Sequence, residues 1–242
     1  MTSFETGERR RRSPGFLIGL TLIALLLFAG FCALGAWQVQ RLGWKRDLIA
    51  RVDARVHAAP VPAPARATRD DEYRRVTATG TFLHDHSTLV QATTVHGAGY
   101  WVLTPLRQPG GAVLLVNRGF VPPAAKTDFD RPQGQIRVTG LLRLTEPGGG
   151  FLRANDPAAD RWYSRDIAAI AAARRLAPAI TSYFIDAQAD SRSGSRLPIG
   201  GLTVIRFPNN HLQYAITWFA LAIMTVGAYI IVLRQTAPDR RT

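Results

Sequence analysis

Cysteine is almost absent from this chain of 242 residues, in which Cys32 is the only one. A single cysteine excludes an intrachain disulfide, a CxxC redox motif and a CxxCH haem-attachment motif. The sequence also lacks a Walker-type phosphate loop, a GxSxG nucleophile elbow and an HExxH zinc helix. This lack of a catalytic constellation favours a binding or scaffolding protein over an enzyme.

Lysine is scarce, whereas arginine is abundant. Lys45 and Lys126 are the only lysines among 30 Lys and Arg residues, and the formal net charge is +13. A basic balance can indicate nucleic acid or anionic lipid as a partner, and a biased genomic base composition would also favour arginine. Because several arginines flank two long apolar runs, we expect contact with a lipid bilayer and no binding of nucleic acid.

Charge is missing from these two runs altogether. Residues 15–37 form a stretch of 23 uncharged residues, and residues 212–233 form a second stretch of 22. At a rise of about 1.5 Å per residue, a helix of either length can cross a hydrocarbon core of about 30 Å. The sequence therefore predicts transmembrane helices at 15–37 and 212–233, with a basic segment at 1–14 before them and a tail at 234–242 after them.

The first run has the basic start of a signal peptide, at Arg9 to Arg12. Its apolar stretch, however, exceeds the usual length of about 7–15 residues. No small-x-small cleavage site follows Trp37, and the bulky Phe31 before Cys32 argues against a lipid-modified cysteine. We therefore expect an anchor that is not cleaved.

Arginines at the two ends of the chain predict its orientation, because positive side chains beside membrane helices favour the cytoplasm. Four arginines precede the first run, at residues 9–12, and Arg234, Arg240 and Arg241 follow the second. Both termini are therefore expected in the cytoplasm. Residues 38–211 would lie outside it, which in a bacterial host means a periplasmic α+β domain anchored in the inner membrane.

The segment between the runs reads as strands and turns. A helical continuation is expected to end near Val56, and the dense prolines of residues 58–68 predict an extended spacer. Strand character follows at residues 75–82, 88–91, 100–106, 112–120, 136–144, 179–185 and 202–207. Residues 165–175 predict a helix, with Asp166 as a charge near its start. The predicted fold is an α+β membrane protein, in which two transmembrane helices flank an antiparallel, barrel-like β domain with one covering helix.

Two short motifs allow more than one interpretation. Arg118, in the stretch Asn117-Arg118-Gly119-Phe120, could present a guanidinium to an anion or pair with a carboxylate at a sheet edge. His84 and His86 are at alternate positions, as in a metal pair, but they fall where a hairpin should turn and have no third ligand nearby in sequence. Solvated loop residues are the alternative at that position.

The most suggestive polar residue is His211, at the start of the second run. Helical spacing puts His211, Tyr214 and Trp218 on one face. Trp37, Arg41 and Trp44 share a face at the end of the first run. The two ends must meet at the same membrane surface, with Lys45 nearby. An ordinary interfacial belt would account for the aromatic and basic residues, but not for the imidazole, which is the commonest haem-iron ligand.

Several stretches in series are similar to the surfeit locus 1 family. They are LGAWQVQR at residues 34–41, YWVLTPL at 100–106, VNRGFVP at 116–122, PIGG at 198–201 and NHLQYAITWF at 210–219, with GLLR at 140–143 and YFIDA at 183–187. The resemblance runs from about residue 34 to residue 219, in order and with sensible spacing.

This resemblance implies an assembly factor for haem–copper terminal oxidases, chiefly of the aa3 type, that helps to mature the catalytic subunit. It also implies two membrane passes and an association with haem a and with the proteins that make or deliver it. His211 corresponds to the family's histidine at the start of the second helix, so it is the expected iron ligand.

The expected cofactor site therefore comprises His211, Trp37, Tyr214, Trp218 and Arg41. The aromatic side chains would wall the macrocycle, and Arg41 or Lys45 would hold its propionates. Two alternatives remain, a scaffold that docks oxidase subunits without any cofactor and an enzyme that acts on the cofactor.

Overall fold

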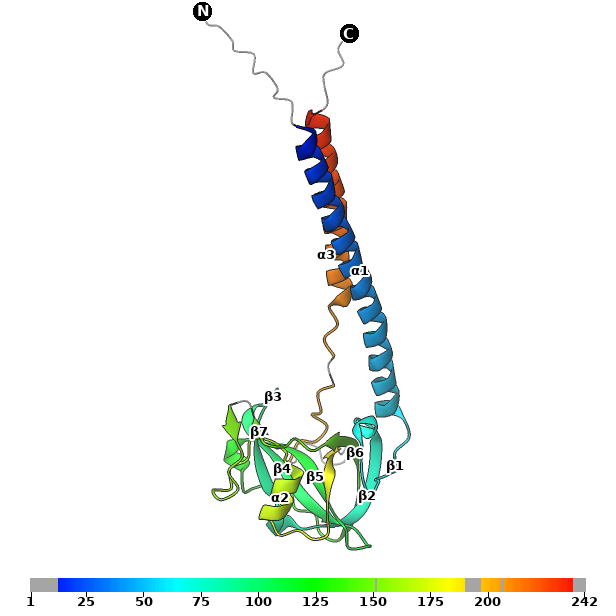
Figure 1. Ribbon diagram of the computed structural model, residues 1–242. Coiled ribbons are helices and arrows are strands. Elements are labelled where there is room, and N and C mark those ends of the chain that lie inside the picture. The colour runs from blue at the N-terminus through cyan, green and yellow to red at the C-terminus, as the bar shows by residue number, and fades with distance from the viewer. Residues whose placement is uncertain (1–12, 151, 190–196, 206, 237–242) are drawn as a thin grey trace, which may run out of the picture. The chain divides into compact units, whose positions relative to one another are not determined.

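The computed structural model describes residues 13–150, 152–189, 197–205 and 207–236. The chain divides into two units, Met1–Ile49 with Phe207–Thr242 and Ala50–Arg206. The first unit contains most of the long helix α1 (Pro14–His57) and all of α3 (His211–Thr236), and the second is the β domain (Figure 1). The expected architecture is confirmed: two long apolar helices flank a barrel-like β domain in the sequence.

Both long helices are apolar enough to cross a membrane by length and composition. The helix α3 has 26 residues, or about 39 Å at the usual rise, which exceeds a hydrocarbon core of about 30 Å. The helix α1 continues without interruption past the apolar run to His57. The helical continuation to about Val56 that the sequence predicts is therefore present. Arg9 to Arg12, Arg240 and Arg241 lie outside the described residues, so the orientation stays a prediction.

Nine strands, one short α-helix and three 3-10 turns (Arg69–Asp71, His84–His86 and Pro123–Ala125) make up the rest of the described secondary structure. The strands are β1 (Val61–Pro62), β2 (Arg75–Phe82), β3 (Thr88–Thr94), β4 (Gly97–Arg107), β5 (Val113–Val121), β6 (Gln135–Leu144), β7 (Gly149–Gly150), β8 (Arg153–Ala154) and β9 (Ala179–Ala187). The helix α2 spans Ile167–Ala173, and the Asp166 carboxylate caps it by accepting the Ala169 N–H at 3.1 Å. This cap satisfies one of the backbone donors that a helix start leaves unpaired.

The main sheet closes on itself. Its order is β1-β2-β6-β9-β5-β4-β3, and a further pairing of β2 with β4 completes a barrel of β2, β6, β9, β5 and β4. Most pairs are antiparallel as predicted, but β5 and β9 run parallel, and so do β1 and β2. The strand β3 lies at the free end of the order, outside the closed ring.

Alternation along the strands separates two cores. Leu114, Val116 and Ile185 point into the cluster inside the barrel. Leu115 and Phe184 point to the other side, where they pack with Trp162 and with Ile167 and Ile170 of α2. The central strands β5 and β9 are therefore apolar on both faces, which is why residues 113–116 read as an unbroken hydrophobic run.

The strand predicted at residues 202–207 is wrong for the part that the structure describes. Residues 202–205 and 207 form no strand, and Arg206 lies outside the described residues. Gly201 has φ +73°, a left-handed conformation that favours glycine. The Thr203 hydroxyl donates to Asp186 at 2.9 Å, so this loop is held by a side chain instead of a ladder.

Candidate functional site

The helices α1 and α3 pack against each other in opposite directions. Their contacts are Thr21 with Tyr229 (2.8 Å between hydroxyl oxygens), Phe31 with Trp218 (ring centroids 5.8 Å apart), and Gly35 with Phe219. A Cβ at Gly35 would lie 2.8 Å from the Phe219 ring, so this glycine permits the close approach. Small residues serve membrane helix interfaces in the same way.

His211 is the first residue of α3 and is joined to α1 by a hydrogen bond. Its Nδ1 lies 2.8 Å from Oε1 of Gln38, a side chain that is only 9 % exposed. Since an amide oxygen can only accept, this bond favours the tautomer in which Nδ1 carries the proton. The other nitrogen, Nε2, is then left with its lone pair, as a metal ligand requires.

The other predicted site residues lie around this hydrogen bond but not on one common wall. Trp218 is half-buried against Phe31 of α1. Trp37 and Tyr214 are 51 % and 53 % exposed, so they flank the helix pair instead of filling its interface. The Arg41 guanidinium lies 4.5 Å from the Trp44 ring centre.

The packing face of α1 differs from the expected aromatic face. Gly35 and Gln38, three residues apart, face α3, whereas Trp37 and Trp44 are about half exposed. One residue of shift turns a side chain about 100° around a helix. Gly35 allows a short interhelical distance, and exposed tryptophans suit a lipid interface. Gln38 is thus the site residue that sequence reasoning missed.

The first unit offers further polar groups near His211. Lys45 Nζ lies 5.3 Å from the ring centre of Phe207. The Asn209 side-chain oxygen is buried and has no hydrogen-bond donor among the residues that the structure describes. An imidazole whose Nε2 has no partner among the described residues, exposed indole and phenol rings and nearby cations together suit a flat, largely apolar ligand that carries acidic groups.

A second polar cluster lies in the β domain, around Asp186 of β9. This carboxylate is 5 % exposed; it accepts from Asn117 Nδ2 at 2.8 Å and pairs with Arg165 at 3.3 Å and Arg143 at 3.5 Å. Glu146 binds Arg165 through two of its guanidinium nitrogens. Burial raises the pKa of Glu146, but the Arg165 hydrogen bonds outweigh it and hold this pKa below its ordinary value.

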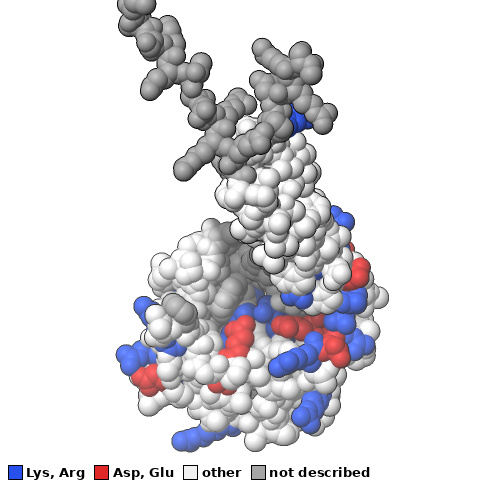
Figure 2. Space-filling view, turned by 45° about the horizontal axis from the view of Figure 1, so that its top comes forward, with Lys and Arg blue, Asp and Glu red and all other residues white. Residues whose placement is uncertain are grey.

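This ion cluster borders a cavity of about 250 Å³. Its charges are balanced within the cluster, because each arginine already faces carboxylates. Figure 2 shows the same mixture over the face of the β domain in view, where basic and acidic side chains adjoin, whereas the middle of the helix pair shows neither. The cluster is therefore a structural ion network and not a ready-made anion site.

Two motifs of uncertain meaning are resolved by their contacts. Arg118 donates to the backbone carbonyl of Asp130 at 2.6 Å, and no carboxylate among the described residues forms an ion pair with it. Burial lowers the pKa of Arg118 to about 10, and its guanidinium lies over the Phe82 ring at 5.1 Å. It covers one side of the barrel core.

His84 and His86 occupy a short 3-10 turn, His84–His86. His84 Nε2 lies 2.8 Å from the Pro132 carbonyl, and His86 Nδ1 lies 3.2 Å from the Arg174 carbonyl. Each ring thus binds backbone. Within the described ranges, no group of three or more His, Cys, Asp or Glu side chains could hold a metal ion.

A family model, described as the SURF1 family, matches residues 25–223. The chain belongs to the SURF1 family. The match begins inside α1 and ends inside α3, so it includes Gln38, His211 and the whole β domain. The match therefore covers both helix ends of the candidate site and the barrel of this chain.

Individual SURF1 relatives cover most of the chain. A SURF1-like protein from Monosiga brevicollis is 33 % identical over 267 residues, which covers 100 % of this chain and 99 % of the relative. Surfeit locus protein 1 from Rattus norvegicus is 36 % identical over 91 % of this chain and 77 % of its own length. The Homo sapiens protein of the same name is 36 % identical over 85 % and 75 %, respectively.

Proposed function

We propose that the protein is a membrane-anchored assembly factor for a haem–copper terminal oxidase of the aa3 type. It binds haem a beside the start of α3 and assists its insertion into the catalytic subunit. The proposal rests on membership of the SURF1 family and on the hydrogen bond between His211 and Gln38. It describes a chaperone that meets haem a delivery proteins and the oxidase subunit, not an enzyme.

The observation that carries the haem assignment is the state of the His211 ring. Because Gln38 Oε1 holds Nδ1, the ring orientation is fixed and Nε2 can donate its lone pair to iron. Metal-binding histidines commonly have such a second hydrogen bond, which fixes the tautomer and raises ligand basicity. A buried glutamine at a helix interface is otherwise costly unless its polar atoms are bonded.

The remaining residues fit the rest of a haem. Trp37, Tyr214 and Trp218 supply apolar surface, and Arg41 or Lys45 can neutralise propionates. A bound haem iron would supply a coordination position for the Nε2 of His211. The protein's part is to offer the Nε2 of the oriented His211 ring and to keep the cations at the polar edge of the site.

The location proposed is an inner membrane with the β domain in the periplasm, for a bacterial host. Arginines before α1 and after α3 support it through the positive-inside tendency. A cysteine placed in the β domain should react with a membrane-impermeant maleimide in whole cells. Reaction only after the cells are lysed would contradict the orientation.

The central experiment is to purify the protein from cells that make haem a and to compare three variants. His211→Ala should remove the Soret band, and Gln38→Leu should weaken haem affinity by about 10–100-fold, as loss of a ligand-orienting partner does. The neighbouring, exposed Leu212→Ala serves as the control and should bind normally.

A colourless wild-type preparation, or a His211→Ala protein with an unchanged spectrum, would overturn the haem role. If the wild-type preparation is colourless and deletion of the gene still lowers the amount of oxidase subunits, the protein would instead be a scaffold that holds assembly intermediates without any cofactor.

A further inference from the structure

The outer edge of the sheet is only partly covered. The strand β3 is the last in the sheet order, and on its outer side the one backbone partner among the described residues is Trp162. That residue bridges Val90, and the Gln91 N–H donates to its carbonyl at 2.8 Å. The next residue whose N–H would face β3 is Ser164, and it donates this N–H to the Asn155 side chain instead, at 3.1 Å. From Ala92 to the hairpin turn, β3 therefore has no strand beside it among the described residues.

The free backbone groups on this edge can be deduced from the strand period. Gln91 N–H points outward to Trp162, and Thr93 is two residues further along, so its N–H and C=O point the same way. Gln91 and Thr93 are exposed. An edge with such groups is a template for one more strand.

A groove lies over the same part of the sheet. It has a volume of about 520 Å³, and its floor includes the cross-strand pairs Gln91 with Tyr100 and Thr93 with Ala98. Opposed residues of an antiparallel pair share one face, so this floor is continuous with the open edge. We call this surface the β3 groove.

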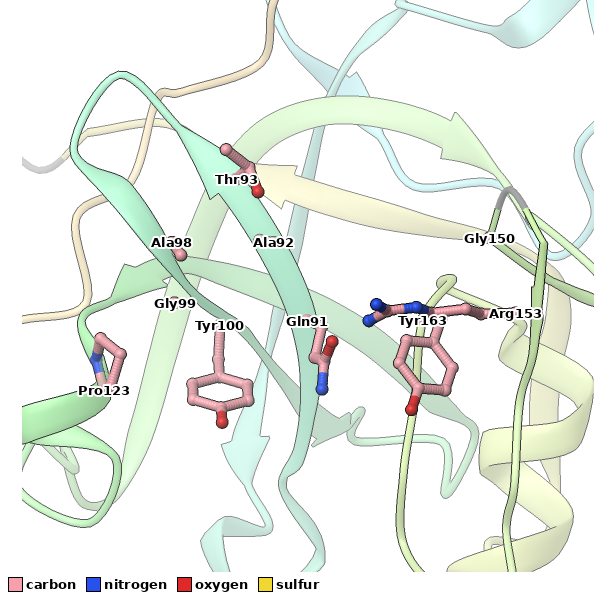
Figure 3. Close-up of a pocket in the computed structure, with 10 residues that line it drawn as sticks. All are labelled: Gln91, Ala92, Thr93, Ala98, Gly99, Tyr100, Pro123, Gly150, Arg153 and Tyr163. Carbon is pink, nitrogen blue, oxygen red and sulfur yellow. The ribbon is translucent and has the colours of Figure 1, made fainter.

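Cations flank the β3 groove. Arg153 stacks over the Tyr163 ring at 5.5 Å and Lys126 over the Tyr100 ring at 5.1 Å. In Figure 3, Arg153 extends from the far side of the groove towards Gln91. Neither cation forms an ion pair with a carboxylate in the described part of the chain, whereas the nearby Asp160 is already bound to Arg174 at 2.6 Å.

We propose that the β3 groove binds an extended, acidic segment of a partner protein, which adds as a strand to β3 beyond Trp162. The open Thr93 backbone groups would bond the peptide main chain, and Arg153 and Lys126 would meet its carboxylates. In strand addition, main-chain bonds supply affinity and side-chain contacts supply specificity. A second copy of this chain fits less well, because it would bring the same cations to the groove.

The test uses the full-length protein in detergent and a fluorescein-labelled seven-residue peptide of alternating valine and glutamate, measured by anisotropy. The wild-type protein should bind this peptide at least tenfold more tightly than a peptide with lysine in place of glutamate. A glutamate peptide whose alternate amides are N-methylated should also bind at least tenfold more weakly, because it cannot complete the strand ladder. Equal binding of the N-methylated peptide would refute strand addition.

Charge-reversal variants separate the groove from general attraction. Arg153→Glu with Lys126→Glu should weaken binding of the glutamate peptide at least tenfold. The control, Arg66→Glu with Arg137→Glu, changes the net charge equally at exposed arginines outside the groove and should change binding less than twofold. Equal losses in the two double variants, or no saturable binding by the wild-type protein, would overturn the proposal.

Thr93→Pro tests the edge itself, since proline removes the outward N–H and is tolerated on edge strands. It should abolish peptide binding with the melting temperature retained, and light scattering should find the wild-type protein monomeric. A dimer that Thr93→Pro dissociates would instead identify a second copy as the occupant. His211→Ala should leave peptide binding unchanged, so the proposal does not depend on the haem role.

Discussion

Replacing Asp186 by alanine should be the most damaging single truncation in the β domain. Its carboxylate is 5 % exposed and accepts hydrogen bonds from Asn117 and Thr203. It also balances two arginines, Arg143 and Arg165, whose side chains are 16 % and 13 % exposed. Removal would leave two largely buried guanidinium groups and the buried Asn117 amide short of a partner.

The size of the effect follows from these contacts. Removing one member of a buried ion pair costs about 3–5 kcal/mol, because the remaining charge stays desolvated. The cost here should lie in the lower part of that range, because Glu146 still pairs with both arginines. In a domain of this size 1 kcal/mol corresponds to a few degrees, so Asp186→Ala should lower the melting temperature by about 10 °C.

The assay is thermal unfolding of the detergent-solubilised protein, followed by circular dichroism of the β domain. Asp186→Asn, which keeps the shape and removes the charge, should fall between wild type and alanine. Asp70 is exposed, and Asp70→Ala should change the melting temperature by less than about 2 °C. A melting temperature for Asp186→Ala within that margin would show that the ion cluster does not stabilise the barrel.

Three further variants test other parts of the structure. Gly35→Val should separate the helices, because its Cβ would lie 2.8 Å from the Phe219 ring. The yield of a cysteine cross-link between the start of α1 and the end of α3 should therefore fall. An unchanged yield would contradict this packing. Arg165 holds the pKa of Glu146 below its ordinary value, so the stability that Glu146 contributes is present above the unfolded-state pKa and is lost as the pH falls through the lower folded-state pKa. In urea titrations at a series of pH values, Glu146→Gln should reduce this loss of stability at acid pH. The same loss in the variant and the wild type would argue against this role of Glu146. Tyr183→Phe deletes a buried hydroxyl that donates at 2.6 Å to the Pro64 carbonyl in the Pro-rich spacer. The free energy of unfolding from the same titrations should fall by about 1–2 kcal/mol. An unchanged free energy would mean that this bond does not fix the spacer.

Local pattern was enough to predict most elements of the fold. Residues 75–82 alternate, and in β2 every second side chain is buried. Asp166 precedes an alanine-rich segment and caps α2. Such signals depend on near neighbours, so a single sequence carries them.

Pairing between distant strands was not predictable in the same way. The parallel pairing of β5 with β9 and the contact of β2 with β4 that closes the barrel depend on which faces meet in three dimensions. The expected antiparallel sheet was therefore right for most pairs and wrong for two. The wrong prediction of a strand at residues 202–207 also comes from a distant contact. The apolar residues there resemble a strand in sequence, but the segment is held as a loop by the hydrogen bond from Thr203 to Asp186.

The helix site was predicted only in outline. His211 and its place at the start of α3 follow from the sequence. The partner Gln38 does not, because its role depends on how α1 is rotated about its axis. Gly35, three residues earlier, was the available signal, since a small residue marks the side on which a second helix can approach.

The position of β9 also limits how the barrel can fold as the chain is synthesised. Ala179–Ala187 is hydrogen-bonded to β6 on one side and to β5 on the other, so the ring stays open until residue 187 has left the ribosome. Until then β5 and β6 each carry an unpaired edge, which exposes a nascent chain to misassociation. Contacts of such long sequence separation also slow folding, so a chaperone that shields open strand edges would be needed most during this interval.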